Sequence, residues 1–306
     1  MGPVARGQAG RGGLIAAIDR YLVALAANDP AGLPLAPGAR FTENGRRLAL
    51  GEGLWRTASG IPGHDYAYVE DESEGQLAWF GVVDEGDHTA VVFVRLRVRD
   101  GRIGEIETIV RRPAPRLYDP ANMARPRAIV FESLDPSERS SRDELVAIGH
   151  GYFDGIVALD ADLIAIREDC LRIENGSQTV LLDDVSAFAG SAAELIFPMS
   201  VRAQVRSGYV AYIDAIRDRR VVAVDEARGL LAMVVVFDHP ARLHSVEVSG
   251  IGEVELPEYH RSPNSLLIAE LFKVRGGRIE HIEAVLEGIP FGAPTGWGRD
   301  PAVHTA

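Results

Sequence analysis

The 306-residue chain contains a single cysteine, Cys170, so a framework of disulfides within the chain is impossible and a zinc–thiolate site is not expected. It also lacks any run of the about 18 apolar residues that a membrane-spanning helix needs. Its first residues have no apolar core of the kind that a secretion signal carries. The sequence therefore predicts a cytoplasmic protein in a reducing compartment.

Basic residues are in the minority, with 32 Lys and Arg against 44 Asp and Glu and a net charge of −12. An acidic chain is poorly suited to nucleic acid or to an anionic membrane surface, so neither partner is expected. Hydrophobic residues make up 46% and charged residues 25% of the chain, as in ordinary soluble globular proteins. At about 150 residues per domain, the length predicts two domains.

The motifs of cofactor-binding and nucleophilic enzymes are also missing. No GxGxxG follows a predicted strand, and the chain has neither a phosphate-binding loop nor a GxSxG elbow. His239 and His244 are the nearest approach to a metal-binding pair, without the further ligands that a zinc site needs. Neither a cofactor nor a metal is expected.

What the chain does contain is an internal repeat. Residues 43–45 and 174–176 both read Glu-Asn-Gly, at the same place in two collinear segments. Three blocks match in order, namely residues 14–45 with 145–176, 71–84 with 225–238, and 101–107 with 277–283. A collinear match of this kind indicates two copies of one domain, with extra residues in the second copy before and after its middle strands.

Both copies show the same succession of predicted elements. An opening segment with apolar residues at helical spacing is followed by a short extended piece. Three strand-like runs end each copy, at residues 77–83, 90–98 and 103–110 and at 230–237, 266–274 and 279–286. In the second copy, a stripe of Val201, Val205, Tyr209, Tyr212 and Ile216 predicts an amphipathic helix. Helices followed by a strand meander predict an α+β fold.

The domain boundaries follow from these elements and from composition. We expect a disordered N-terminus at residues 1–13, a first domain at 14–112, and a Pro-, Arg- and Ser-rich linker at 113–140. A second domain at 141–288 and a C-terminal tail at 289–306 complete the chain. Residues 239–264 have no counterpart in the first copy and predict an insertion, either a lid or an extra hairpin.

A family resemblance appears in the opening of the first copy. Residues 20–25 (Arg-Tyr-Leu-Val-Ala-Leu), continuing through Asn28-Asp29 to Phe41-Thr42-Glu43, resemble the first helices and strand of the ketosteroid-isomerase and SnoaL-like group of nuclear-transport-factor-2-like proteins. The closing pattern of a strand, Gly-Arg-Ile and then Ile-Glu is similar to that group as well.

The resemblance implies two tandem cone-shaped domains. Each would have a strongly bent, mostly antiparallel sheet wrapped around N-terminal helices, with an apolar pocket at the open end of the cone. It also implies that the two domains pack together as members of this fold do in dimers, and it leaves a homodimer of the whole chain open.

The resemblance further implies three catalytic positions in the second copy. Isomerase-like members use a helix tyrosine, a basic carboxylate at the end of the first strand and a protonated acid on a late strand. These positions match Tyr152, Glu174 and Glu270. The first copy has Val94 in place of Glu270, so the second copy is predicted to hold the active pocket.

Strand alternation supports the choice of Glu270 independently of the resemblance. It puts Glu270 on the face shared with Ile268 and Phe272, and apolar surroundings should raise the pKa of its carboxyl. An ion pair is the structural alternative for Glu270, as a core position is for Tyr152 and a turn for Glu174.

Other side chains could line the pocket. His239 and Glu283 are further candidates for proton transfer. The candidate substrate-binding residues are Tyr209, Tyr212, Arg217, Arg220, His281 and Trp55. The arginines have a structural alternative, because cations are favourable at the end of a helix.

The sequence therefore predicts a cofactor-independent acid–base enzyme of the lyase, isomerase or dehydratase type. Its substrate would be a small hydrophobic molecule, plausibly aromatic, bound in the second cone. A non-catalytic carrier of a small ligand is the alternative, and a scaffold for protein–protein contacts is a third hypothesis.

Overall fold

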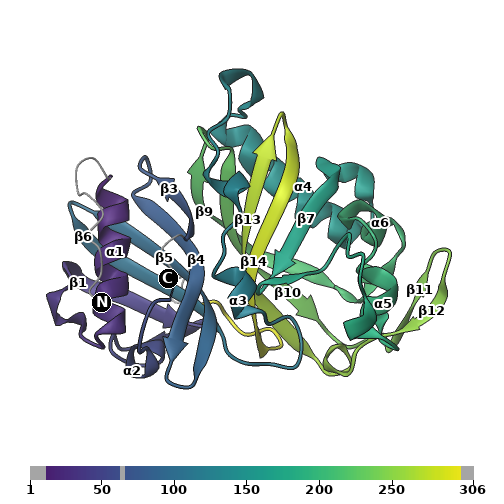
Figure 1. Cartoon of the computed structure of the whole chain (residues 1–306), viewed down its shortest axis with the longest axis horizontal. Helices are drawn as coiled ribbons and strands as arrows, with labels where there is room; N and C mark the ends of the chain where they lie inside the picture. Colours follow the sequence, from purple (N-terminus) through teal and green to yellow (C-terminus); the bar gives the residue numbers. More distant parts are fainter. Residues whose placement is uncertain (1–11, 63–65, 298–306) are drawn as a thin grey trace, which may run out of the picture.

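The computed structural model describes residues 12–62 and 66–297. The expected disordered N-terminus, apart from its last two residues, and the end of the expected tail lie outside this part of the chain. The two halves of the chain lie side by side, with the first at the purple and blue end of the colour bar (Figure 1). Within the described ranges, every helix is too short or too polar to cross a membrane.

The described part of the first half consists of one long helix, two short helical segments and a six-stranded sheet. The strand order is β2-β1-β6-β5-β4-β3, in which β1 and β6 are parallel and the other neighbours antiparallel. Its elements are α1 (Gly13–Ala26), η1 (Pro30–Gly32), β1 (Leu35–Glu43), β2 (Arg46–Leu48), α2 (Leu54–Thr57), β3 (Ala67–Asp71), β4 (Gln76–Glu85), β5 (His88–Arg99) and β6 (Arg102–Arg111).

The second half repeats this plan with the order β8-β7-β14-β13-β10-β9, again with one parallel pair, β7 and β14. Its main elements are α4 (Arg142–Ala158), β7 (Ile166–Glu174), β8 (Ser177–Gln178), α5 (Ala192–Ile196), α6 (Val201–Arg206), η6 (Tyr209–Tyr212), β9 (Ala215–Asp225), β10 (Leu230–His239), β13 (Asn264–Arg275) and β14 (Arg278–Pro290). The predicted α+β fold with two tandem domains is confirmed.

The connecting segments are more structured than their composition suggests. Between the halves lie α3 (Pro120–Met123), η2 (Ala128–Phe131) and η3 (Pro136–Glu138). Before α6 lie η4 (Ala161–Leu163) and η5 (Ser186–Phe188). The insertion forms the hairpin β11 (Ser245–Val248) and β12 (Gly252–Glu255), followed by the single turn η7 (Glu258–His260).

The prediction of one amphipathic helix through Val201, Tyr212 and Ile216 is wrong. The helix α6 ends at Arg206, because Gly208 adopts a left-handed conformation with φ of 83° that stops it. Ile216 lies in β9, where it pairs with Phe237 of β10. The apolar spacing that resembles one helix arises from a short helix, a 3-10 turn and a strand that all face the same core.

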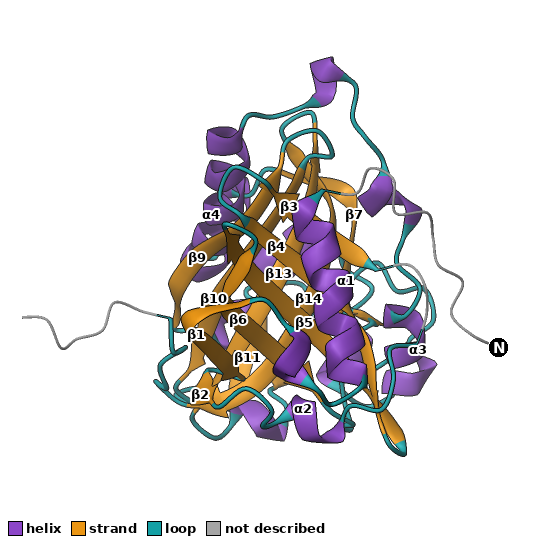
Figure 2. Ribbon diagram, turned by 90° about the vertical axis from the view of Figure 1, so that its left-hand side faces the viewer, coloured by secondary structure: helices purple, strands orange, loops and turns teal. Residues whose placement is uncertain are grey.

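Strand alternation divides the apolar side chains into three layers. One face of each sheet packs against its own helices, as the position of α1 across the strands illustrates (Figure 2). The opposite faces share a single apolar cluster, to which β4 and β5 contribute from the first half and β10 and β13 from the second. The two domains are thus joined by sheet-to-sheet packing.

Polar contacts fix the relative position of the two sheets. The carboxylate of Glu107 on β6 is 1% exposed and accepts hydrogen bonds from Arg220 on β9 (2.6 and 3.0 Å) and from Arg95 on β5 (3.0 Å). The C-terminal segment returns to the first half, where the indole N–H of Trp297 donates to the hydroxyl of Thr42 at 2.7 Å.

We predict that Glu107→Ala lowers the free energy of unfolding by about 3–5 kcal/mol, because it removes a buried carboxylate that pairs with the buried Arg95 and the half-buried Arg220. Urea unfolding at neutral pH measures this loss. The matched control is Glu105→Ala, which removes a more exposed carboxylate bonded to the same Arg95 and should cost about 1 kcal/mol or less. Equal losses in the two variants would contradict this account of the interface.

Candidate functional site

Ionisable side chains from three elements meet in the second cone. A capping box formed by Ser141 and Glu144 starts α4, which places Tyr152 in the core. The ring of Tyr152 packs edge-on against Phe272 of β13, with 5.2 Å between centroids. Arg172 and Glu174 come from β7, and Glu270 comes from β13.

The predicted surroundings of Glu270 are confirmed. Its neighbours on the same face, Ile268 and Phe272, belong to the apolar core between β13 and α4, whereas Leu271 faces the other domain. Glu270 is 2% exposed, and its Oε2 atom has no hydrogen-bond partner in the described structure. Burial, reinforced by the nearby charge of Glu174, raises the pKa of Glu270 to about 8, so the carboxyl is mostly neutral at pH 7.

Arg172 is the member of this cluster that sequence reasoning missed. Its guanidinium donates to the hydroxyl of Thr179 (3.0 Å) and to the side-chain oxygen of Gln204 (2.7 Å), and its Nε lies 3.6 Å from a carboxylate oxygen of Glu174. Alternation along β7 could have revealed it, because position 172 shares a face with Glu174.

The pKa of the Tyr152 hydroxyl is acted on in opposite directions by Glu270 and Arg172. Burial and the charge of Glu270 raise the pKa of its hydroxyl, while a hydrogen bond with Arg172 opposes the shift. The hydroxyl therefore keeps its proton at neutral pH and is available as a donor. The structure thus brings Tyr152, Glu174 and Glu270 together, with Arg172 as a cation among them.

Aromatic and imidazole rings gather near Glu174 of this cluster. Tyr209 and Tyr212, two of the predicted binding residues, lie on η6 with their ring centroids 5.6 Å apart. His239, at the end of β10, lies 5.4 Å from the ring of Tyr212 and bonds through Nδ1 to Asn264. Tyr259 and His260 of the insertion complete this group, which we call the mouth of the second cone.

The predicted binding arginines lie elsewhere. Arg217 and Arg220 lie on β9 and not at the end of a helix, contrary to the sequence analysis. Arg217 bonds to Asp238 at 2.8 Å, and Arg220 bonds to Glu107 of the first domain. Both side chains are engaged in structural contacts, so they take no part in the cluster around Glu270.

Glu283 and His281 also lie away from the second cone. They share a face of β14, as expected, and the imidazole Nε2 of His281 is 3.0 Å from the carboxylate of Glu283. That face is opposite to Ile282, which belongs to the core of the cone, and Glu283 pairs with Arg127 of the linker at 3.3 Å. Neither residue lines the second cone.

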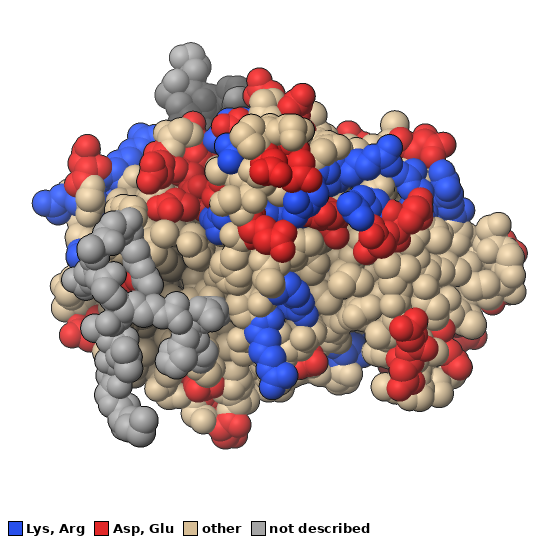
Figure 3. Space-filling model, turned by 45° about the horizontal axis from the view of Figure 1, so that its top comes forward, with Lys and Arg blue, Asp and Glu red and all other residues tan. Residues whose placement is uncertain are grey.

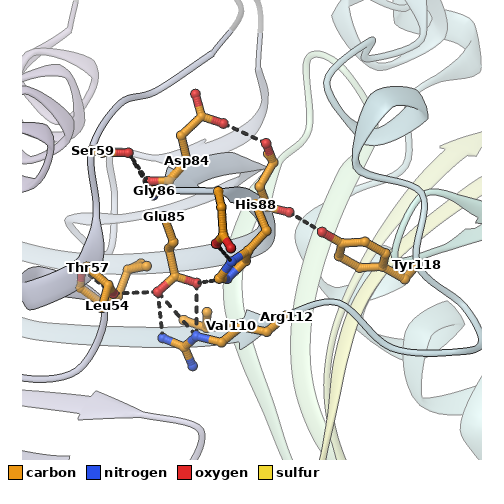
Figure 4. A network of polar contacts seen from close by, with 12 residues as sticks. Leu54, Thr57, Ser59, Asp84, Glu85, Gly86, His88, Val110, Arg112 and Tyr118 are labelled. Carbon is orange, nitrogen blue, oxygen red and sulfur yellow. Dashed lines mark hydrogen bonds and ion pairs between the residues drawn. The ribbon is translucent and has the colours of Figure 1, made fainter.

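The first cone has an apolar interior and a polar entrance. Trp55 is 1% exposed and packs edge-on against Tyr21 at 5.3 Å, in the same core as Val94. At the entrance, Glu85 accepts hydrogen bonds from Arg112 and Thr57 (Figure 4). Although burial favours the neutral form, these bonds hold the pKa of Glu85 below its usual value.

Two hollows of the described surface lie outside both cones. One, of about 310 Å³, is formed between the domains by residues 70–73 and 224–227 with Arg142, and the other, of about 360 Å³, lies beside the hairpin of the insertion at His244 and Arg261. On the face in Figure 3, acidic and basic side chains mix in one band and leave much of the remaining surface uncharged. Neither hollow includes Glu270, and the apolar pocket expected there stays a prediction.

The described residues contain no group of three or more His, Cys, Asp or Glu side chains arranged to hold a metal ion. The groups that the second cone offers are a neutral acid, tyrosines, an arginine and a carboxylate.

The chain matches a known family over most of its length. The family model described as "Domain of unknown function (DUF8021)" matches residues 7–110 and 138–286. No curated protein matches the chain.

Solved structures similar to the chain each match about half of it. An epoxide hydrolase from M. tuberculosis has 10% identity and a TM-score of 0.27, over 47% of this chain and 84% of its own. PrhC from Penicillium brasilianum has 15% identity and a TM-score of 0.27, over 48% and 83%. An NTF-2 like protein of unknown function from Burkholderia xenovorans has 11% identity and a TM-score of 0.28, over 52% and 95%.

The raised pKa of Glu270 has a consequence for stability. A proton held by the folded protein stabilises it fully below the ordinary pKa of 4.5, and this stabilisation is lost as the pH rises through about 8. We therefore predict that the free energy of unfolding of the unaltered protein falls, relative to Glu270→Gln, by up to about 1.4 kcal/mol per pH unit across this window.

Urea unfolding of the unaltered protein and of Glu270→Gln from pH 5 to pH 8 measures the difference between their free energies of unfolding. The other titrating groups are common to both proteins, so their contributions cancel. A difference that does not change with pH would show that Glu270 is ionised in the folded protein.

Proposed function

The chain belongs to the family described as domain of unknown function (DUF8021), and we propose that its second cone is the active site of a cofactor-independent acid–base enzyme. The substrate would be a small, largely apolar and aromatic molecule with an acidic C–H bond. The reaction would be proton abstraction next to a carbonyl group, as in isomerases and in lyases that eliminate or cleave after forming an enolate.

The observation that carries this proposal is the buried carboxyl of Glu270. It is neutral at pH 7, one of its oxygens has no partner, and it lies in an apolar core beside the protonated hydroxyl of Tyr152. A folded protein gains nothing in stability from a buried acid with an unpaired oxygen. Such a group is suited to donate a hydrogen bond to a developing oxyanion.

The remaining residues supply the other half of the reaction. Glu174 is the proposed base, since it lies at the edge of the cluster and Arg172 keeps a positive charge beside it. The proton would pass from the substrate carbon to the Glu174 carboxylate, and the electron pair would move to the carbonyl oxygen. Tyr152 and Glu270 would donate hydrogen bonds to that oxygen, and the proton would then return to a carbon of the product.

His239 is the second candidate for the base. Burial lowers the pKa of its imidazole, so the ring is neutral at pH 7 and able to accept a proton. Because it lies at the mouth and bonds to Asn264, it would act on a substrate atom farther out than the atom served by Glu174.

Exchange of carbon-bound hydrogen for deuterium tests the proposal without knowledge of the natural substrate. We predict that the protein in D₂O accelerates the uptake of deuterium at the carbon next to the carbonyl group of the aromatic ketones 2-tetralone, 2-indanone or phenylacetone. Proton NMR measures the rate of this exchange. Glu174→Gln should reduce the rate by about 10²–10⁴-fold, as expected for loss of a general base. Tyr152→Phe and Glu270→Gln should each reduce it by about 10²–10³-fold, as expected for loss of an oxyanion donor.

The matched control is Glu43→Gln, because Glu43 occupies in the first cone the position that Glu174 occupies in the second. Its exchange rate should equal that of the unaltered protein. A rate no higher than that of buffer for all three ketones would overturn the enzyme proposal in favour of a ligand carrier. Equal losses of rate in Glu174→Gln and Glu43→Gln would place the chemistry outside the second cone.

A further inference from the structure

Two of the rings in the mouth of the second cone come from a segment that the first cone lacks. In the first domain β4 and β5 are joined by Gly86 and Asp87 alone, whereas in the second domain residues 240–263 join β10 to β13. Near its end this insertion forms the turn η7, which supplies Tyr259 and His260 to the mouth.

His260 is buried among rings rather than among hydrogen-bonding groups. It is 3% exposed, and its Nδ1 atom has no hydrogen-bond partner in the described structure. Its ring centroid lies 4.1 Å from that of Tyr212 at an interplanar angle of 35°, 3.9 Å from that of Tyr259, and 4.7 Å from that of His239. The imidazole therefore fills a space of the size of a flat ring, while its Nδ1 atom is buried without the stabilisation of a hydrogen bond.

The turn that carries His260 is bonded mainly to itself. The backbone N–H of His260 donates to Pro257, that of Arg261 donates to Glu258, and the guanidinium of Arg261 donates to Leu256. Asn264, at the start of β13, donates to the carbonyl of Tyr259. These bonds lie within residues 256–264, so the turn can leave the mouth without breaking the sheet.

The tyrosines around His260 lie within reach of the charges of the cluster around Glu270. Besides burial, the charge of Glu174 contributes to the raised pKa values of Tyr209, Tyr212 and Tyr259, and that of Arg172 acts on the first two. A ring in place of His260 would therefore stack on tyrosines that the charge of the proposed base reaches.

We propose that Tyr212 and His239 form the walls of a cage for a planar aromatic ring, and that His260, carried by its turn, occupies this cage until a ligand displaces it. The inference rests on the proposed function for the ligand's chemistry, since it names the part of the substrate that the mouth recognises. It also accounts for a mouth that the protein's own side chains fill.

The probe for this cage is 2-naphthol, a planar ring system whose own fluorescence reports binding. We expect His260→Ala to bind 2-naphthol about tenfold more tightly than the unaltered protein, because the ligand no longer competes with the imidazole. The double variant His260→Ala/Tyr212→Leu should lose this gain, because stacking on Tyr212 is removed. Equal affinity in His260→Ala and the unaltered protein would overturn the proposal.

The shape of the cage is tested with 1-adamantanol, which is apolar but not flat. Displacement of 2-naphthol by 1-adamantanol should be no stronger in His260→Ala than in the unaltered protein. An equal gain for both molecules would mean that the substitution only opens an apolar hole, and would refute a cage for planar rings.

Hydrogen exchange on the unaltered protein gives a second measurement that does not depend on the folding of a variant. Saturating 2-naphthol should speed amide exchange in residues 257–263, because the turn is displaced, and unchanged or slower exchange there would contradict displacement. Absence of ketone exchange in the unaltered protein, together with intact 2-naphthol binding, would count against the proposed function and leave the cage in place.

Discussion

The apolar layer between the two six-stranded sheets is the constraint on which the rest of the structure depends. Each strand of the meanders gives alternate side chains to this layer and the others to its own cone, so the shared layer fixes which residues face inward. Glu270 faces the second cone because Leu271 faces the first domain. The charged contact of Glu107 with Arg220 then sets how the sheets lie on each other. A shift of one residue in β13 would turn the buried Glu270 towards the domain interface.

The two cones share one backbone plan but place their charged groups at opposite positions. In the first, Val94 leaves the interior apolar, and the charged groups gather at the entrance, where Arg112 bridges Glu43 and Glu85. In the second, the ionisable groups lie inside and the entrance is aromatic. The strand-end position of Glu85 is taken by His239 in the second copy, and an aromatic turn covers it. The difference arises from a few substitutions and one insertion on a common backbone.

Much of this arrangement could be predicted from the sequence, for physical reasons that also explain the failures. The repeat and the strand runs predicted the fold, and a period of two placed Glu270 in an apolar core. Arg172 was missed because an arginine on a strand usually reaches solvent, and only the fold brings Gln204 and Thr179 within its reach. The helix predicted through Ile216 failed because pairing with β10 overrides a local apolar period. The role of His260 could not be foreseen, because an insertion without periodicity gives no sign of what it covers.

Sheet-to-sheet packing within one chain has a consequence for how the protein responds to dilution. When two such domains belong to separate molecules, their association weakens as the protomer concentration falls, and folding can depend on it. Here residues 113–140 tie the domains together, so each sheet finds its partner at a fixed effective concentration set by the connecting segment. The covered sheet faces, and with them the orientation of the second cone's interior, are thereby independent of how much of the protein a cell makes.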